Sequence, residues 1–466
     1  MAELGSRLIE MGIINSEQLG QALDRQRTHG GRLGVNLKAM GFIREEDLAR
    51  VFSRIPLPPR NIKETGLEYS MIEGLIIKQL LSLGEFKVAD VAARVKLPAS
   101  MVEYVLEALR KDHLVDVKGA SSYTSMSYEY RITEAGRESA MRLLELCRYV
   151  GPAPIPLEMY AEMIELQTVK GIVVGEEQVK KAFSHLVISD RKVQQLGPAI
   201  TSGQAMFIYG PPGNGKSSIA EAISTVLTDP VYIPYAVSVG EQIINIYDPI
   251  SHILVDEDVD ETKDQRWLKV RRPVVMTGGE LTMRMLDLDF NPISKFYEAS
   301  LQMKANNGLL IIDDFGRQQA DPRQILNRWI VPLDRRIDFM TLHTGMKFTI
   351  PFDMLMIFAT NIDPKALVDD AFLRRIRYKI KIEHPSMEEF SGIFKAVCRS
   401  NDVEFSQSAF DYLIEQFYKK RGISYSASHP RDIVDHIVNY SRYYNRPPAM
   451  TEETVRYACE NYFVAE

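Results

Sequence analysis

One stretch of the sequence has the residue types and the spacing that phosphate binding needs. Gly210 is followed, after four residues, by Gly215, Lys216 and Ser217, and an apolar run at residues 205–209 comes directly before it. Glycines let a loop turn tightly so that its backbone N–H groups face phosphate oxygens, and the N-terminus of a following helix attracts negative charge. The lysine ammonium can reach the terminal phosphates, while the serine hydroxyl can bind Mg²⁺. The pattern therefore predicts a strand, a loop and a helix that hold a nucleoside triphosphate.

A chance glycine-rich loop is the alternative for this stretch, and the flanking strand and helix argue against it. We expect ATP and Mg²⁺ as the ligands. The residues predicted to bind the nucleotide are Gly210, Pro211, Pro212, Gly213, Asn214, Gly215, Lys216, Ser217 and Ser218.

A pair of carboxylates follows another buried run of the chain. Residues 308–312 are glycine and apolar residues, and they lead into Asp313 and Asp314. Asp313 would hold Mg²⁺ through water, beside Ser217, and Asp314 would orient or deprotonate the water that attacks the γ-phosphate. An ordinary capped strand end is the alternative interpretation of the same two acids.

With both motifs present, residues 165–466 resemble the AAA+ ATPase family. The resemblance implies ATP hydrolysis and self-assembly into a ring, which in this family is usually a hexamer. Many members have Asp-Glu where this sequence has Asp313 and Asp314. The shorter second acid keeps the carboxylate chemistry and permits a slow, switch-like ATPase.

The same resemblance implies roles for further residues. Asn361, at the end of an apolar run, looks like the sensor-1 side chain that binds the γ-phosphate or the attacking water. Arg375, with Arg374 beside it, is similar to the arginine finger that reaches the nucleotide of a neighbouring subunit; a basic cluster on a solvated surface is the alternative. Arg431 looks like the sensor-2 arginine of a helical lid, with an ion pair to Asp435 as the rival interpretation.

Around these residues the sequence predicts a multidomain α/β protein. Apolar strand runs alternate with helical stretches over the core, as in a doubly wound parallel sheet covered by helices. Residues 272–280 and 296–304 make the chain between the two phosphate-site motifs longer than a minimal core, and we expect insertions there that contact a substrate. The predicted domains are a small helical tandem-repeat domain at 1–55, a winged-helix domain at 62–150, an AAA+ P-loop α/β core at 165–384 and a C-terminal helical lid at 385–466.

The first predicted domain contains an internal repeat of leucines and glycines. It resembles the N-terminal domain of type II secretion and type IV pilus ATPases, a subset of which binds cyclic di-GMP. The match is partial, because Glu3 and Ile55 stand where that subset has an arginine and a glutamine. A docking module that binds no dinucleotide is the alternative. The positions that match the binding subset are Leu4, Gly5, Leu8, Gly12, Leu19, Leu23, Gln26, Arg32, Leu33, Gly34, Leu37, Gly41 and Leu48.

The second predicted domain suggests a winged helix. We expect helices at 70–81, 88–95 and 99–112, followed by strands at 115–117 and 128–132. The third helix carries Glu103 and Glu107 on its forward turns, whereas DNA phosphates require clustered lysine and arginine. Contact with a protein, or a role as a spacer between domains, is therefore favoured over contact with a duplex.

Composition limits the possible partners. The chain has 466 residues and a formal charge of −6, from 56 basic and 62 acidic side chains, so nothing attracts it as a whole to nucleic acid or anionic membranes. Its three cysteines are far apart. With no signal-peptide pattern and no spanning run, we expect a cytoplasmic protein without membrane insertion.

Two functions of different kinds fit these features. The first is an ATPase that remodels a protein or an assembly, with an unknown protein substrate or envelope machinery as its partner and cyclic di-GMP as a candidate regulator. The second is a DNA-associated AAA+ switch that uses the winged helix for duplex binding. A binding scaffold without hydrolysis is a third alternative.

Overall fold

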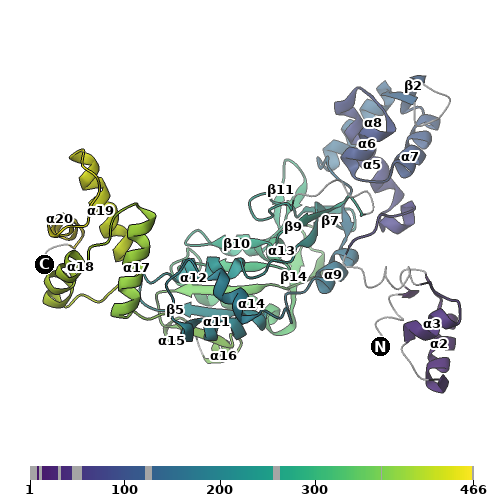
Figure 1. Ribbon diagram of the computed structural model, residues 1–466. Helices are drawn as coiled ribbons and strands as arrows, with labels where there is room; N and C mark the ends of the chain where they lie inside the picture. The colour runs from purple at the N-terminus through teal and green to yellow at the C-terminus, as the bar shows by residue number, and fades with distance from the viewer. Residues whose placement is uncertain are drawn as a thin grey trace. The chain divides into compact units, whose positions relative to one another are not determined.

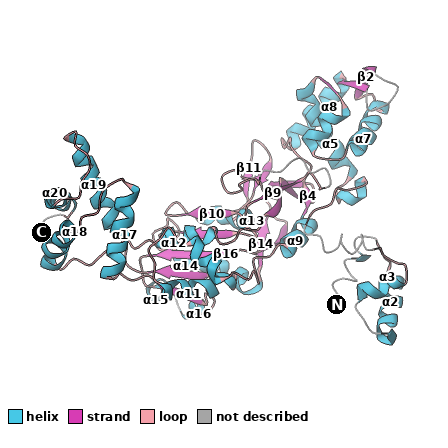
Figure 2. Cartoon of the chain, in the orientation of Figure 1, coloured by secondary structure: helices cyan, strands magenta, loops and turns pink. Residues whose placement is uncertain are grey.

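The computed structural model describes residues 8–9, 13–29, 33–44, 55–120, 128–255, 263–368 and 370–463 (Figure 1). The chain divides into two compact units. The first contains the described parts of 1–146, 150–155 and 256–268, and the second those of 147–149, 156–255 and 269–466. Helices and strands are mixed in both units, so the protein is a multidomain α/β structure (Figure 2).

A five-stranded parallel sheet is the centre of the second unit. The hydrogen-bonded neighbours run in the order β10 (Val274–Thr277), β13 (Leu309–Ile312), β16 (Leu355–Thr360), β5 (Met206–Tyr209) and β17 (Tyr378–Lys381). All four pairings are parallel. The loops that follow β5, β13 and β16 therefore leave the sheet at the same edge, its carboxyl edge.

Helices cover both faces of this sheet, as the alternation of its side chains requires. Met206 and Ile208 of β5 point into a core formed with α10 (Glu176–Ala182), α11 (Asp190–Thr201) and α12 (Lys216–Ser224). Phe207 points the other way, into a core that includes α14 (Pro322–Arg335) and its buried Trp329. The short helices α13 (Leu301–Ala305), α15 (Pro364–Leu367) and α16 (Asp370–Leu373) complete this part. Burial on both faces explains why the inner strands β13, β16 and β5 are almost wholly apolar, whereas the edge strand β17 carries Lys379 and Lys381.

Further strands lie between α12 and β16 in the chain. Strands β7 (Ala236–Val239), β8 (Gln242–Asn245), β12 (Phe296–Glu298) and β11 (Asp289–Asn291) are neighbours in a second sheet, and β14 (Ile337–Thr341) pairs with β15 (Lys347–Pro351). The remaining elements here are β6 (Val231–Pro234), β9 (Trp267–Val270), whose first two residues are assigned to the first unit, and the 3₁₀ helix η3 (Met283–Leu286).

The interpretation of residues 272–280 as an insertion is wrong. They contain β10, the edge strand of the main sheet, which pairs with β13 from Val274–Leu309 to Thr277–Ile312. Four residues are too few for the alternation of side chains to distinguish such a strand from a loop. Residues 296–304 do leave the main sheet, because they form β12 and most of α13.

Helices fill the end of the second unit beyond β17. They are α17 (Met387–Ser400), α18 (Gln407–Leu413), the π-helix η4 (Ile414–Lys419), α19 (His429–Tyr443) and α20 (Glu452–Tyr462). Their apolar faces share one core around Phe390, Phe410 and Ile433. The first helix of the same unit is α9 (Leu157–Leu166). Within the described residues, no helix combines the length and the apolar composition that a membrane span requires.

The first unit contains two groups of elements. Helices α2 (Ser16–His29) and α3 (Leu33–Ala39) pack around a small apolar core. The later group has the order η1 (Ile62–Thr65), α5 (Tyr69–Leu83), β1 (Glu85–Phe86), α6 (Val88–Val95), α7 (Ala99–Lys111), β2 (Val115–Ala120), β3 (Tyr128–Ile132) and α8 (Glu134–Leu146). Its strands form an antiparallel sheet in the order β1-β3-β2. The two-residue strand β4 (Ile155–Pro156) follows, with Ile155 assigned to the first unit and Pro156 to the second.

A buried ion pair joins distant parts of the first unit. The side chains of Arg266 and Asp264 are 0% and 1% exposed and pair at 2.8 Å. Arg266 also donates from Nη1 to the carbonyls of Thr65, at 3.0 Å, and Pro154, at 3.4 Å, and the Asp264 N–H donates to the Pro56 carbonyl. Residues 263–268 therefore belong to the first unit, although the sequence predicts them inside the 165–384 core.

Replacing Arg266 by alanine should destabilise the first unit by about 3–5 kcal/mol, because Asp264 would remain buried without its partner. The urea dependence of hydrogen exchange in α5, α6 and α7, which lie wholly within the first unit, measures this loss of stability. Arg137→Ala, which removes an exposed arginine from the same unit, is the control. An equal effect of both variants would contradict this role of the ion pair.

Candidate nucleotide-binding site

The predicted phosphate loop joins β5 to α12 at the carboxyl edge of the sheet. Gly210, Gly213 and Gly215 have φ of 143°, 75° and 75°, which L side chains rarely adopt. A Cβ on Gly210 would lie 1.9 Å from the Ile382 carbonyl oxygen, so only glycine fits there. The loop has the tight turns that a phosphate cradle needs.

Lys216 is the first residue of α12 and its side chain lies beneath the loop, with the residue 6% exposed. Its Nζ donates to the Gly210 carbonyl at 3.0 Å and to the Pro211 carbonyl at 2.9 Å. Burial lowers the pKa of Lys216, and the carboxylates of Asp314 and Asp313 oppose this shift. The two acids thus favour the charged ammonium that a phosphate would meet.

Ser217 and Asp313 are brought together as predicted for a magnesium site. Ser217 Oγ donates to Asp313 Oδ2 at 2.7 Å, although the two residues come from α12 and from the end of β13. A hydroxyl and a carboxylate are hard oxygen donors, which Mg²⁺ prefers, usually with waters and phosphate oxygens completing its shell. The two side chains therefore fit a Mg²⁺ ion that arrives with a nucleotide.

The turn after β13 places Asp314 beside Asn361. Asp314 has φ of 47°, the left-handed region that costs a non-glycine residue energy. Its N–H donates to Asp313 Oδ1 at 2.9 Å, and Asn361 Nδ2 donates to its Oδ1 at 3.1 Å. The amide and the carboxylate thus lie side by side, where a water between them could be held and oriented.

Gln318 supports this turn, and the sequence interpretation missed it. Its Nε2 donates to the carbonyls of Asp313 and Asp314 at 2.9 and 3.1 Å, and its Oε1 accepts from the Gly316 N–H at 2.7 Å. These bonds stabilise the strained backbone at Asp314. An amide side chain just beyond two acids is too common a pattern to be recognised without coordinates.

The chain between η4 and α19 contacts the phosphate loop directly. Asn214 Oδ1 accepts from the Ala427 N–H at 3.1 Å, and Ser426 Oγ donates to the Gly213 carbonyl at 3.1 Å. Asn214 and Ser426 are 6% and 7% exposed. Asn214 also lies 3.5 Å from Nδ1 of His384. Asn214, which the sequence predicts to bind nucleotide, therefore also bonds to the helical segment at the end of the unit.

A cavity of about 880 Å³ lies against these groups. This volume is within the range of about 300–1,000 Å³ that small-molecule sites occupy. Its polar lining residues include Lys216, Ser217, Ser218, Asp313, Asp314 and Asn361, and its apolar lining residues include Leu186, Val187, Ile188, Ile393 and Val397. The phosphates of a nucleotide can face the first group while its base lies against the second. The sequence did not indicate the apolar wall, because its residues come together only in the folded chain.

Arg431 lines the same cavity from α19. Its side chain is 73% exposed, and its Nε lies 3.9 Å from the Asp432 carboxylate. The acid that it approaches is thus Asp432, its neighbour in sequence, rather than the Asp435 that the rival interpretation names. At this distance the ion pair is weak, and the arginine can turn toward a ligand.

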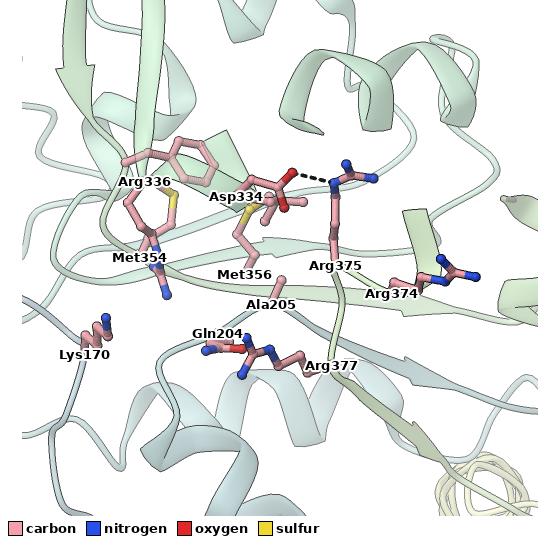
Figure 3. Close-up of a pocket in the computed structure, with 12 residues that line it drawn as sticks. Lys170, Gln204, Ala205, Asp334, Arg336, Met354, Met356, Arg374, Arg375 and Arg377 are labelled. Atoms are coloured by element: carbon pink, nitrogen blue, oxygen red, sulfur yellow. Dashed lines mark hydrogen bonds and ion pairs between the residues drawn. The ribbon is translucent and has the colours of Figure 1, made fainter. Parts of the chain in front are cut away.

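Arg374 and Arg375 lie elsewhere. They line a separate cavity with residues that precede the sheet strands, and Arg375 Nε pairs with Asp334 at 2.8 Å (Figure 3). The four residues of β5 separate its two ends by about 13 Å, at about 3.3 Å per residue. These arginines are therefore far from the phosphate loop of their own chain.

The N-terminal positions are only partly described. Leu8, Leu33 and Leu37 are buried in the small core with Gly34, Leu19 and Gln26 are half-buried, Leu23 is exposed, and Gly41 has φ of 72°. Leucines in the core support the structure of the repeat rather than a ligand surface. The candidate dinucleotide residues Leu4, Gly5, Gly12, Arg32 and Leu48 lie outside the described residues.

Residues 386–461 match the family model of a domain of unknown function, DUF8689. No curated protein matches the sequence.

Several solved structures resemble the chain distantly. The Holliday junction branch migration motor RuvB of Thermotoga maritima is 15% identical over 63% of this chain and 72% of its own, with a TM-score of 0.34. Domain III of the replication initiation protein DnaA of Thermotoga maritima is 12% identical over 61% and 98%, with a TM-score of 0.36. NtrX of Brucella abortus is 12% identical over 68% and 60%, also at 0.36. With TM-scores below 0.5, these likenesses assign neither a fold nor a function.

Two glycines of the loop allow a matched test of its contact with the helical end. A Cβ on Gly213 would lie 2.5 Å from Ser426 Oγ and 2.6 Å from Ser428 Oγ, whereas a Cβ on Gly215 meets nothing within 4 Å. Both glycines have the same φ, so the backbone strain of an alanine is equal. Gly213→Ala should therefore open the contact and Gly215→Ala should not.

The readout is hydrogen exchange of residues 423–432 without nucleotide, where Gly213→Ala should raise the rate several-fold. Removing both hydroxyls, with Ser426→Ala and Ser428→Ala, should cancel the difference between the two glycine variants. Equal exchange in Gly213→Ala and Gly215→Ala would refute the contact.

Proposed function

We propose that the chain is an ATP hydrolase of the AAA+ type, whose turnover drives the remodelling of a protein or an assembly. The observation that carries the proposal is the continuous line of contacts from Ser217 to Asp313, Asp314 and Asn361 beside the phosphate loop. The order of the sheet supports it, because β16 lies between β13 and β5 and puts Asn361 between the acids and the loop.

Each group has a distinct part in the chemistry that we propose. The loop N–H groups and Lys216 bind the phosphate oxygens, and Ser217 with Asp313 would hold Mg²⁺, which neutralises phosphate charge. Asp314 orients the attacking water and accepts its proton, and the amide of Asn361 fixes both the carboxylate and the water. Arg431 reaches the nucleotide from α19.

Two substitutions separate binding from hydrolysis. Lys216→Ala should weaken ATP binding about 10- to 100-fold, since hydrogen bonds to a charged group contribute about 1.5–3 kcal/mol. Asp314→Asn should leave binding nearly unchanged and slow turnover at least about 100-fold, because the amide cannot accept the proton. Fluorescent-nucleotide titration and phosphate release measure the two steps.

Asp314→Glu is the control, because it keeps a carboxylate and matches the acid common in the AAA+ family. It should retain turnover. Full activity of Asp314→Asn would remove Asp314 from the mechanism, and ATP binding without any phosphate release from the wild type would favour a scaffold.

The position of Arg375 supports a ring in which copies share active sites. A finger that cannot reach its own nucleotide can act only on the nucleotide of a neighbouring copy. Its positive charge would stabilise the charge that develops on the transferred phosphoryl group. We therefore propose a homo-oligomer, with Arg375 as the finger and Arg374 as the second candidate.

A mixing experiment tests this sharing. At an ATP concentration that the wild type binds but Lys216→Ala does not, Lys216→Ala chains should turn over little ATP, and Arg375→Ala chains should be slower by about 10³-fold. In a 1:1 mixture, random pairing joins an intact loop to an intact finger at about a quarter of the interfaces, so about a quarter of the wild-type rate should return. Arg335→Ala, an exposed change in α14, is the control and should be active alone. Full activity of Arg375→Ala alone would contradict the assignment.

The modules of the first unit support a partner-binding role. The order from α5 to β3, with its three-stranded antiparallel sheet, fits the winged helix that the sequence predicts. In α7, Arg110 is paired with Glu107 at 2.9 Å, so it is less available to phosphates. We propose that this domain contacts a protein. Regulation by cyclic di-GMP through Arg32 stays a prediction, and duplex binding stays the alternative.

A further inference from the structure

A second cavity, of about 560 Å³, has an unusual charge balance. Among the described residues that line it are five cationic side chains and a single carboxylate. Phe352, Met354 and Met356 are apolar residues that also line this cavity. The cations are Lys170, Arg336, Arg374, Arg375 and Arg377, and the carboxylate is Asp334.

This cavity lies at the amino edge of the main sheet. Ala205, Met354 and Arg377 directly precede β5, β16 and β17, which are parallel neighbours. The phosphate loop follows the other end of β5. The two cavities are thus at opposite edges of one sheet, and the second cannot be an extension of the nucleotide cavity.

Three cations reach into the same open space from different elements. Figure 3 shows Arg336, Lys170 and Arg377 directed toward it with Gln204 beside them, whereas Arg374 points away. Arg336 ends α14 with φ of 59° and donates from Nη2 to the Gly203 carbonyl at 2.7 Å, which fixes its head. Burial lowers the pKa of Arg336, with Asp353 opposing the shift. Its charge is therefore poorly solvated.

Crowding like charges beside apolar residues is unfavourable unless an anion joins them. The guanidinium groups of Arg336 and Arg377 and the ammonium group of Lys170 converge from three sides. Such an arrangement suits an anion with several oxygens, such as a chain of phosphates, better than one planar carboxylate. The volume suits a small molecule rather than a polymer.

We propose that this cavity binds a polyphosphate group, held by Lys170, Arg336 and Arg377. The group can come from a free short-chain polyphosphate, such as inorganic triphosphate, or from the nucleotide of a neighbouring copy. The second source rests on the proposed function, since it requires shared sites, and the first does not. Lys170, Arg336 and Arg377 have no role in the nucleotide site described above.

The first arm of the test measures free polyphosphate. Full-length Lys216→Ala, which has lost the lysine of the phosphate loop, is titrated with inorganic triphosphate by calorimetry at a concentration where light scattering finds monomers. Adding Arg377→Gln or Lys170→Gln should weaken binding about tenfold, as expected for one charge-assisted hydrogen bond. Adding Arg335→Gln, which removes one positive charge from the residue before Arg336, should change the affinity for triphosphate less than twofold. Binding should weaken with added salt.

The second arm measures the neighbouring nucleotide. With the phosphate loop intact, ATP-dependent self-association is followed by light scattering for Arg377→Gln and Arg335→Gln. If Arg377→Gln associates about tenfold more weakly and Arg335→Gln does not, the bound polyphosphate group is that of the neighbouring nucleotide. If dilute protein binds no triphosphate and both variants associate equally, the proposal is overturned. Absence of ATP turnover in the wild type would count against the proposed function and leave the first arm valid.

Discussion

The parallel arrangement of the five central strands is the constraint on which the site depends. Because all of them run in one direction, the loop after β5, the acids after β13 and Asn361 after β16 meet at a single edge. The hydrogen bond between Ser217 and Asp313 is the direct result, joining residues 96 positions apart in the sequence. The alternation of Met206, Phe207 and Ile208 between two helix-covered cores packs the strand that carries the phosphate loop on both faces.

Strain at this edge is balanced by neighbouring hydrogen bonds. Asp314 occupies the left-handed region, at a cost of order 1–3 kcal/mol for a residue with a side chain. Asn361 holds its carboxylate and Gln318 holds the carbonyls of the turn. Such bonds contribute about 1 kcal/mol each, so together they offset the strain. The carboxylate therefore keeps one direction, which water activation requires.

The sequence predicted what depends on local pattern. The strand and loop around Gly210, the acids after β13 and the bounds of α6 and β3 follow from spacing within a few residues. The sequence did not predict features that depend on contacts between distant segments. Examples are the position of β10 in the sheet, the apolar lining residues 186–188 of the cavity and the hydrogen bond between Asn214 and Ala427. Residues 263–268 were misplaced for the same reason, because a buried ion pair decides their position rather than any periodicity.

The two edges of the sheet are chemically unlike, and this limits how copies could assemble. The carboxyl edge carries the phosphate loop and two acids, while the amino edge carries the arginine-rich cavity. If the finger of one copy acts on the nucleotide of the next, the contact joins unlike surfaces and cannot be a two-fold interface. Head-to-tail contacts of this kind close into a ring or continue as a filament. Shared sites thus imply an assembly in which every copy both supplies a cation and receives one.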